Sequence, residues 1–92
     1  MEDRYEGAKM HCERGLTLYR RDRFNDAITE FTRAIRLYPN ARCYSNRGVA
    51  YGQLGKYNEA IAYFEEALEL DPGNASYLDN LAKAERALAL GW

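Results

Sequence analysis

An internal repeat constrains this chain more than any other feature of its sequence. When the chain is shifted against itself by 33 residues, identical residues coincide along most of one copy. A third, partial copy follows at an offset of 34 and is long enough for one helix. So many matches at one offset indicate two copies of a structural unit and the first part of another. The coinciding pairs include Ala8 with Ala41, Gly15 with Gly48, Asn25 with Asn58, Ala27 with Ala60, Phe31 with Phe64, Ala34 with Ala67 and Pro39 with Pro72.

Each copy has the pattern of two helices joined by a tight turn. In the second copy, Tyr44, Gly48 and Tyr51 recur at the three- and four-residue spacing of one helical face. Gly55 suits the left-handed residue that follows a helix end, and Asp22 takes its place in the first copy. The pattern predicts helices over residues 6–20, 24–37, 42–54, 58–70 and 75–90.

Small residues recur at the points where helices are expected to cross. Gly15, Gly48 and Ala82 occupy the same place in the three copies, and we expect each to meet a partner helix there. A glycine inside a helix costs about 1 kcal/mol relative to alanine, so its recurrence indicates a packing role. The opposing helices carry alanines that would let the helix axes approach closely. These are Ala27, Ala34, Ala60 and Ala67.

This combination of small residues, aromatic spacing and closing proline resembles the tetratricopeptide repeat family. The segment 44–61 is close to the family consensus, and the resemblance covers residues 8 to about 90. Arg14 and Arg47 depart from it, since the family often has leucine there. We expect their stems to lie along the hairpin and their guanidinium groups to reach water.

The resemblance implies an all-α fold. It predicts a right-handed superhelix of two antiparallel helical hairpins followed by a fifth, closing helix. The chain would then be a single domain over residues 1–92, with repeat one at about 8–40, repeat two at about 41–74 and a capping helix at about 75–90.

The same resemblance implies a protein-interaction module. In this family the first helix of each hairpin lines a concave groove that holds an extended peptide. Five of the residues carried over to that groove are basic and one is acidic, which favours an acidic peptide or a chain-terminal carboxylate. The groove residues are Lys9, Cys12, Leu16, Tyr19, Arg20, Arg42, Ser45, Asn46, Val49, Gln53, Ser76, Asp79, Asn80, Lys83 and Arg86.

Some family members bind the acidic tails of large heat-shock chaperones through a carboxylate clamp. That clamp has a lysine and an asparagine on the first helix, an asparagine on the third, and a lysine and an arginine on the fifth. Only Asn46 matches its place, because Cys12, Leu16, Ser76 and Asn80 occupy the others. The complete clamp is therefore not expected, although a chaperone cofactor remains among the roles that the family suggests.

The charge balance and hydropathy exclude other classes of protein. The 13 basic and 14 acidic side chains argue against nucleic-acid binding driven by bulk charge. No apolar run approaches the roughly 20 residues that cross a bilayer, and residues 1–5 lack the apolar stretch of a signal peptide. We therefore predict a cytoplasmic protein without membrane contact. Because thiols stay reduced in the cytosol, Cys12 and Cys43 are expected to be free.

No catalytic or metal-binding pattern is present in the sequence. His11 is the one histidine, and a structural or solvated role is expected for it. His11, Cys12 and Cys43 fall short of the four closely spaced ligands of a structural zinc site. Most of the eight tyrosines, such as Tyr44 and Tyr51, fall on packing positions. We predict a protein that is not an enzyme and that uses no cofactor or metal.

Two alternatives to a peptide-binding adaptor stay open. The first is a self-assembling structural unit, because stacked hairpins leave hydrophobic ends that need polar caps. Asp79, Lys83, Glu85 and Arg86 would give the fifth helix polar faces. The uncapped N-terminal end would then be the surface for homo-oligomer formation. The second is an excised or engineered fragment of a longer array, with which an end at Gly91-Trp92 is compatible.

Overall fold

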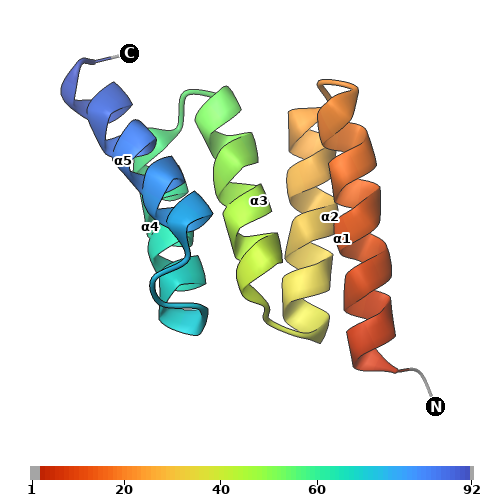
Figure 1. Cartoon of the computed structure of the whole chain (residues 1–92). Helices are drawn as coiled ribbons and strands as arrows, with labels where there is room; N and C mark the ends of the chain where they lie inside the picture. The colour runs from red at the N-terminus through yellow and green to blue at the C-terminus, as the bar shows by residue number, and fades with distance from the viewer. Residues whose placement is uncertain (1–2, 92) are drawn as a thin grey trace.

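The chain folds into five α-helices that stack side by side (Figure 1). A computed structural model describes residues 3–91; Met1, Glu2 and Trp92, which the predicted domain includes, lie outside this range. The Cα atoms extend over 48 × 29 × 16 Å. The all-α prediction is confirmed, and each predicted helix agrees with the structure to within two residues. The helices are α1 Arg4–Arg20, α2 Phe24–Leu37, α3 Ala41–Gln53, α4 Tyr57–Leu70 and α5 Ala75–Ala89.

The helices form two hairpins and a closing helix. α1 packs on α2, α3 packs on α4, and α5 packs on the outer side of α4. On one face α1, α3 and α5 contact one another in turn, whereas α2 and α4 do not touch each other among the described residues. Because neighbouring helices approach more closely on the inner side of a curved layer, the face formed by α1, α3 and α5 is the concave one.

The turns repeat the same chemistry at equivalent places. After α1 the backbone of Asp22 has φ 60°, and after α3 that of Gly55 has φ 76°, so both residues adopt the left-handed conformation that the sequence predicted. Asn40 and Asn74 immediately precede α3 and α5 as N-cap residues. The side chain of each accepts a hydrogen bond from a backbone N–H of the first turn. Such caps satisfy donors that a helix leaves open at its N-terminus.

Each hairpin is built around a glycine that faces a phenylalanine ring. A Cβ atom on Gly48 would lie 2.7 Å from Cε1 of Phe64, and Gly15 makes the same close approach to Phe31. Both glycines and both rings are buried. Ala82 was expected at a third crossing, and this is wrong: it is exposed, because none of the helices described in residues 3–91 packs on this side of α5. The opposing alanines, Ala27, Ala34, Ala60 and Ala67, are all 0% exposed.

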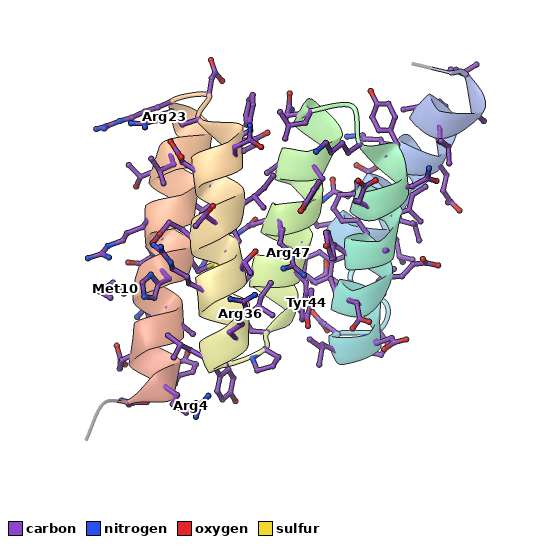
Figure 2. The ribbon with its side chains drawn as sticks, turned by 180° about the vertical axis from the view of Figure 1, so that it is seen from behind. Arg4, Met10, Arg23, Arg36, Tyr44 and Arg47 are labelled. Atoms are coloured by element: carbon purple, nitrogen blue, oxygen red, sulfur yellow. A yellow bond between two sulfur atoms is a disulfide. The ribbon has the colours of Figure 1, made fainter. Side chains whose placement is uncertain are left out.

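Arg47 is half-buried, and its guanidinium group lies against aromatic rings of α3 and α4. Its guanidinium carbon lies 3.9 Å from the ring centroid of Tyr63 and 5.4 Å from that of Tyr44 (Figure 2). Nη1 also donates a hydrogen bond to the Thr32 hydroxyl at 3.2 Å. A guanidinium stacks well on aromatic faces, so the position holds a cation between tyrosines. Arg14 is exposed, as predicted.

Cys12 and Cys43 form a disulfide, so the prediction of two free cysteines is wrong. Cys12 lies on α1 and Cys43 lies in the first turn of α3, and their Cα atoms are 6.0 Å apart. This separation falls in the range of disulfides. The redox compartment favoured free thiols, whereas stacking of the repeats brings α1 and α3 together and places the two cysteines side by side. The cystine thus links the two repeats covalently on the concave face.

Replacing the two glycines of α3 by alanine should have opposite effects. Gly48→Ala places a methyl group against the Phe64 ring, and overpacking of this kind typically costs about 1–3 kcal/mol. Gly52→Ala is the matched control, because a Cβ there meets nothing within 4 Å, and it should stabilise the helix by up to about 1 kcal/mol. Urea unfolding measures both. Equal midpoints for the two variants would contradict the packing described.

Reduction of the cystine should lower the free energy of unfolding substantially. The bond closes a loop between residues 31 apart in sequence, and loop-closure entropy predicts a loss of about 3–4 kcal/mol when it opens. Thermal unfolding with and without a dithiol measures this change, and the Cys12→Ala/Cys43→Ala variant should not respond to the dithiol. Two reactive thiols per chain in the unreduced, denatured protein would show that the bond is absent.

Candidate functional site

The concave face carries cross-helix hydrogen bonds at intervals of about one repeat. The Asn46 amide of α3 donates to Sγ of Cys12 on α1 at 3.8 Å. The Asn80 amide of α5 donates to the hydroxyl of Ser45 on α3 at 3.5 Å, so the second interface repeats the contact of the first. Near the other end of the face, Gln53 donates to the Tyr19 hydroxyl at 3.1 Å. These bonds fix the spacing of the helices that line the groove.

The predicted groove residues lie on α1, α3 and α5 but differ in solvent exposure. Cys12 and Ser45 are buried where adjacent helices meet, so they present little side-chain surface to the groove. Leu16, Tyr19, Asn46, Val49 and Asn80 are half-buried. The remaining ones are exposed: Lys9, Arg20, Arg42, Gln53, Ser76, Asp79, Lys83 and Arg86.

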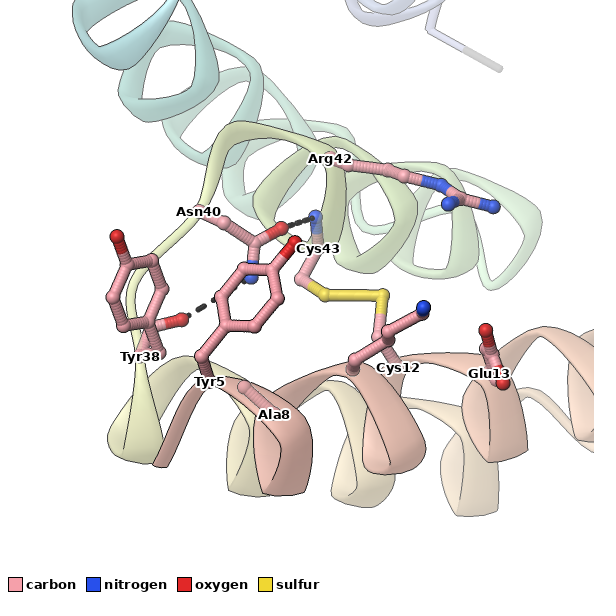
Figure 3. Close-up of a pocket in the computed structure, with 9 residues that line it drawn as sticks. Tyr5, Ala8, Cys12, Glu13, Tyr38, Asn40, Arg42 and Cys43 are labelled. Carbon is pink, nitrogen blue, oxygen red and sulfur yellow. Dashed lines mark hydrogen bonds between the residues drawn. A yellow bond between two sulfur atoms is a disulfide. The ribbon is translucent and has the colours of Figure 1, made fainter. Parts of the chain in front are cut away.

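A pocket of about 250 Å³ opens between α1 and the start of α3. Figure 3 shows the cystine in its floor, with Tyr5 and Tyr38 at one end and Glu13 and Arg42 at the other. The two tyrosine rings meet edge to face, with centroids 5.4 Å apart. The residues that line the pocket are Tyr5, Ala8, Lys9, Cys12, Glu13, Tyr38, Asn40, Arg42 and Cys43.

The aromatic end of this pocket was not predicted from the sequence, although its two tyrosines occupy the same place in successive repeats. Tyr5 and Tyr38 coincide at the offset of 33 residues, and so do Lys9 and Arg42. Each pair therefore occupies one place of the repeat and is brought together when α1 stacks beside α3. Both tyrosines are exposed, at 55% and 48%, so the hydrophobic pattern that marks the core did not single them out.

The groove cations are divided between two places. Lys9 and Arg42 line the pocket, whereas Lys83 and Arg86 do not. Lys83 instead forms an exposed ion pair with Asp79 one turn earlier on α5, with the two atoms 2.9 Å apart. Exposed pairs of this kind contribute little to stability, and they leave the lysine available to an incoming anion.

His11 takes part in a structural cluster away from the pocket. Its Nδ1 lies 2.9 Å from a carboxylate oxygen of Glu30 on α2, and Arg33 pairs with the other oxygen. The hydrogen bond with His11, together with Arg33, lowers the pKa of the Glu30 carboxyl against the opposing effect of burial. Glu30 is 8% exposed, so these partners satisfy a carboxylate that would otherwise be buried alone.

Two other kinds of site are absent from the part of the chain that the structure describes. Among residues 3–91, no three His, Cys, Asp or Glu side chains gather in a way that could hold a metal ion. None of the helices in that range has the length and apolar character that crossing a bilayer requires.

Solved structures share this architecture. The second tetratricopeptide domain of Spaghetti (RPAP3), bound to the HSP90 peptide SRMEEVD, is 27% identical with a TM-score of 0.89, over 92% of this chain and 80% of that one. The Arabidopsis OM64 domain is 26% identical with a TM-score of 0.91, over 95% and 73%. The first domain of human RPAP3 is 32% identical with a TM-score of 0.88, over 95% and 68%.

Comparison of the sequence with protein families gives the same result. The chain matches no curated protein sequence closely enough to count as a relative. Family models of the tetratricopeptide repeat match residues 8–41 and 41–74, which together make up most of the chain. With the helical hairpins and the repeated glycine–phenylalanine contact, these matches establish that the chain belongs to the tetratricopeptide repeat family.

Proposed function

We propose that this chain is a peptide-binding adaptor that holds an extended, acidic peptide on the face formed by α1, α3 and α5. The observation that carries the proposal is the set of exposed cations on that face: Lys9, Arg20, Arg42, Lys83 and Arg86. Asp79 and Glu13 are the acidic residues beside them. Because opposite charges guide association and set orientation, this face favours an acidic partner over a basic one.

The solved relatives support a peptide as the partner. Two domains of Spaghetti (RPAP3), 27% and 31% identical to this chain, hold the acidic HSP90 peptide SRMEEVD. A domain of human RPAP3 that is 31% identical holds the HSP70 peptide SGPTIEEVD. These complexes support an adaptor of the same general kind, and they leave the peptide of this chain to be identified.

The chaperone tails themselves are not the favoured ligands. At the first-helix places of the carboxylate clamp, Cys12 is bonded to Cys43 and Leu16 is a half-buried aliphatic residue. Ser76 and Asn80 take the places of the cations on α5. Asn46 alone remains, and one of its amide hydrogens already points to Cys12 Sγ. The cations on this face therefore lie at positions other than those of the carboxylate clamp. We propose that the ligand is an acidic sequence different from the chaperone tails.

A non-catalytic role and a cytosolic location stay predictions. The cystine, however, favours an oxidising compartment over the cytosol, where thiols are kept reduced.

Charge reversal on the groove should abolish capture of acidic peptides. An array of acidic and basic peptides, with SRMEEVD among them, selects binders, and the double variant Arg42→Glu/Lys83→Glu should lose them while its helicity is unchanged. Binding by the parent should weaken with salt, since the Debye length falls from about 10 Å at 0.1 M to about 3 Å at 1 M. Glu65→Gln/Glu66→Gln on α4 is the control. Acidic peptides that bind the double reversal as tightly as the parent would refute the proposal.

Self-association of the chain is the second candidate function, and one observation favours it. Leu78, Leu88 and Leu90 on or just after α5 are 49%, 43% and 58% exposed, so the closing segment presents large apolar side chains to solvent. Tyr5 and Met10 at the N-terminal helix, which the sequence analysis favoured as the contact surface, are exposed as well.

Light scattering over a range of concentrations tests this second candidate. A dimer that Leu78→Lys/Leu88→Lys dissociates, while Met10→Lys leaves it intact, would support contact through α5. A chain that stays monomeric up to millimolar concentration would remove self-association from consideration.

A further inference from the structure

We propose that the pocket between α1 and α3 binds the C-terminal residue of a peptide whose last side chain is apolar. Lys9 and Arg42 would hold the terminal carboxylate, and the side chain would lie over the cystine against Tyr5 and Tyr38. This inference rests on the proposed function, because it specifies which end of a groove-bound peptide is read and where.

The interior of the pocket suits an apolar group. Its floor is the Cys12–Cys43 disulfide with Ala8 beside it, and neither offers a strong hydrogen bond. Tyr5 and Tyr38 close one end with two aromatic rings that meet edge to face. A volume of about 250 Å³ lies just below the range of about 300–1,000 Å³ that holds whole small molecules. The pocket therefore has a size that suits one residue of a longer peptide.

The rim of the pocket suits a carboxylate. Lys9 and Arg42 both line it and are exposed, and neither forms an ion pair with a residue that the structure describes. Glu13 is the one acidic lining residue, so the local charge is positive. Asn40 is already engaged, since its side chain accepts from Cys43 N at 2.9 Å and donates to the Tyr38 carbonyl at 3.1 Å. Lys9 and Arg42 are therefore the charged groups of the lining that would bind the anion.

A terminal residue satisfies both parts of the pocket at once. Its α-carboxylate and its side chain branch from the same carbon, so one can reach the cations while the other fills the apolar floor. An internal aspartate or glutamate carries its charge at the tip of its side chain and would bring no apolar group to the tyrosine end. The chemistry of the lining thus favours a chain end with an apolar side chain over an internal acidic residue.

The pocket occurs at only one of the two interfaces between first helices. Because Pro39 coincides with Pro72, Asp71 stands where Tyr38 stands, and at the offset of 34 Ser76 stands where Arg42 stands. The interface between α3 and α5 therefore lacks both the second aromatic ring and the second cation. This asymmetry predicts that a bound peptide ends at α1 and α3 and extends from there toward α5.

Binding of matched peptides to the oxidised protein tests the inference. The probe is a labelled octapeptide of glycine, serine and two internal glutamates that ends in leucine with a free carboxylate. The comparison peptides are its C-terminal amide and the same peptide ending in serine. Removing a terminal charge that two cations hold should weaken binding about tenfold or more, and the serine peptide should also bind more weakly. Amide chemical-shift mapping should place the leucine beside Ala8 and Cys43.

Two single substitutions separate the two halves of the pocket. Arg42→Gln should weaken the free-acid peptide about tenfold and leave the amide almost unaffected. Tyr38→Ser should remove the preference for leucine over serine while the response to amidation persists. Arg14→Gln, which removes an exposed cation of α1 that is not one of the groove residues, is the matched control and should change binding of the free acid less than twofold.

The outcomes distinguish this inference from the proposed function. If the amide binds as tightly as the free acid, or the shifts fall away from the pocket, the inference is overturned while acidic-peptide binding by the groove stands. If the probe does not bind at millimolar concentration although array peptides do, the inference again fails alone. If neither the probe nor any array peptide binds, both are overturned.

Discussion

The contact between a helical glycine and a phenylalanine ring determines the rest of this structure. At Gly15 and Gly48 the missing side chain lets the ring of the second helix lie directly on the backbone of the first. This close approach brings Ala27, Ala34, Ala60 and Ala67 to full burial and sets the crossing of each hairpin. Because both hairpins share it, they stack with their first helices on one side, and the concave face follows from that stacking.

Arg47 departs from the family pattern, which often has leucine at this position, and the hairpin accommodates it by contacts with its neighbours. The position lies on α3 where it meets α2 and α4, and a leucine there would simply fill space. The arginine instead lies between Tyr44 and Tyr63 and donates to Thr32. Its Nε is buried without a hydrogen-bond partner, so aromatic contact and one hydrogen bond compensate for the loss of water. The repeat thus accommodates a half-buried charged residue at a position where two tyrosine rings lie against it.

Local and periodic features were predictable from the sequence, whereas contacts between repeats were only partly so. Helix bounds, the left-handed Asp22 and Gly55, and the buried alanines all follow from patterns within one repeat. The cystine depends on how α1 lies against α3, which spacing alone does not give. Ala82 was misplaced because its identity matches a crossing that has no partner helix. The tyrosine end of the pocket was not predicted, because hydrophobic periodicity identifies buried residues and both tyrosines are exposed.

The disulfide gives the two halves of the concave face different stiffness. Between α1 and α3 a covalent bond is added to the hydrogen bond from Asn46, so their separation is fixed before any ligand arrives. Between α3 and α5 the corresponding place has only the bond from Asn80 to Ser45, and α5 is otherwise held through α4. Ordering a surface on binding costs free energy, and a preorganised surface avoids that cost. The first half should therefore select partners by rigid shape, and the second by adjusting to them.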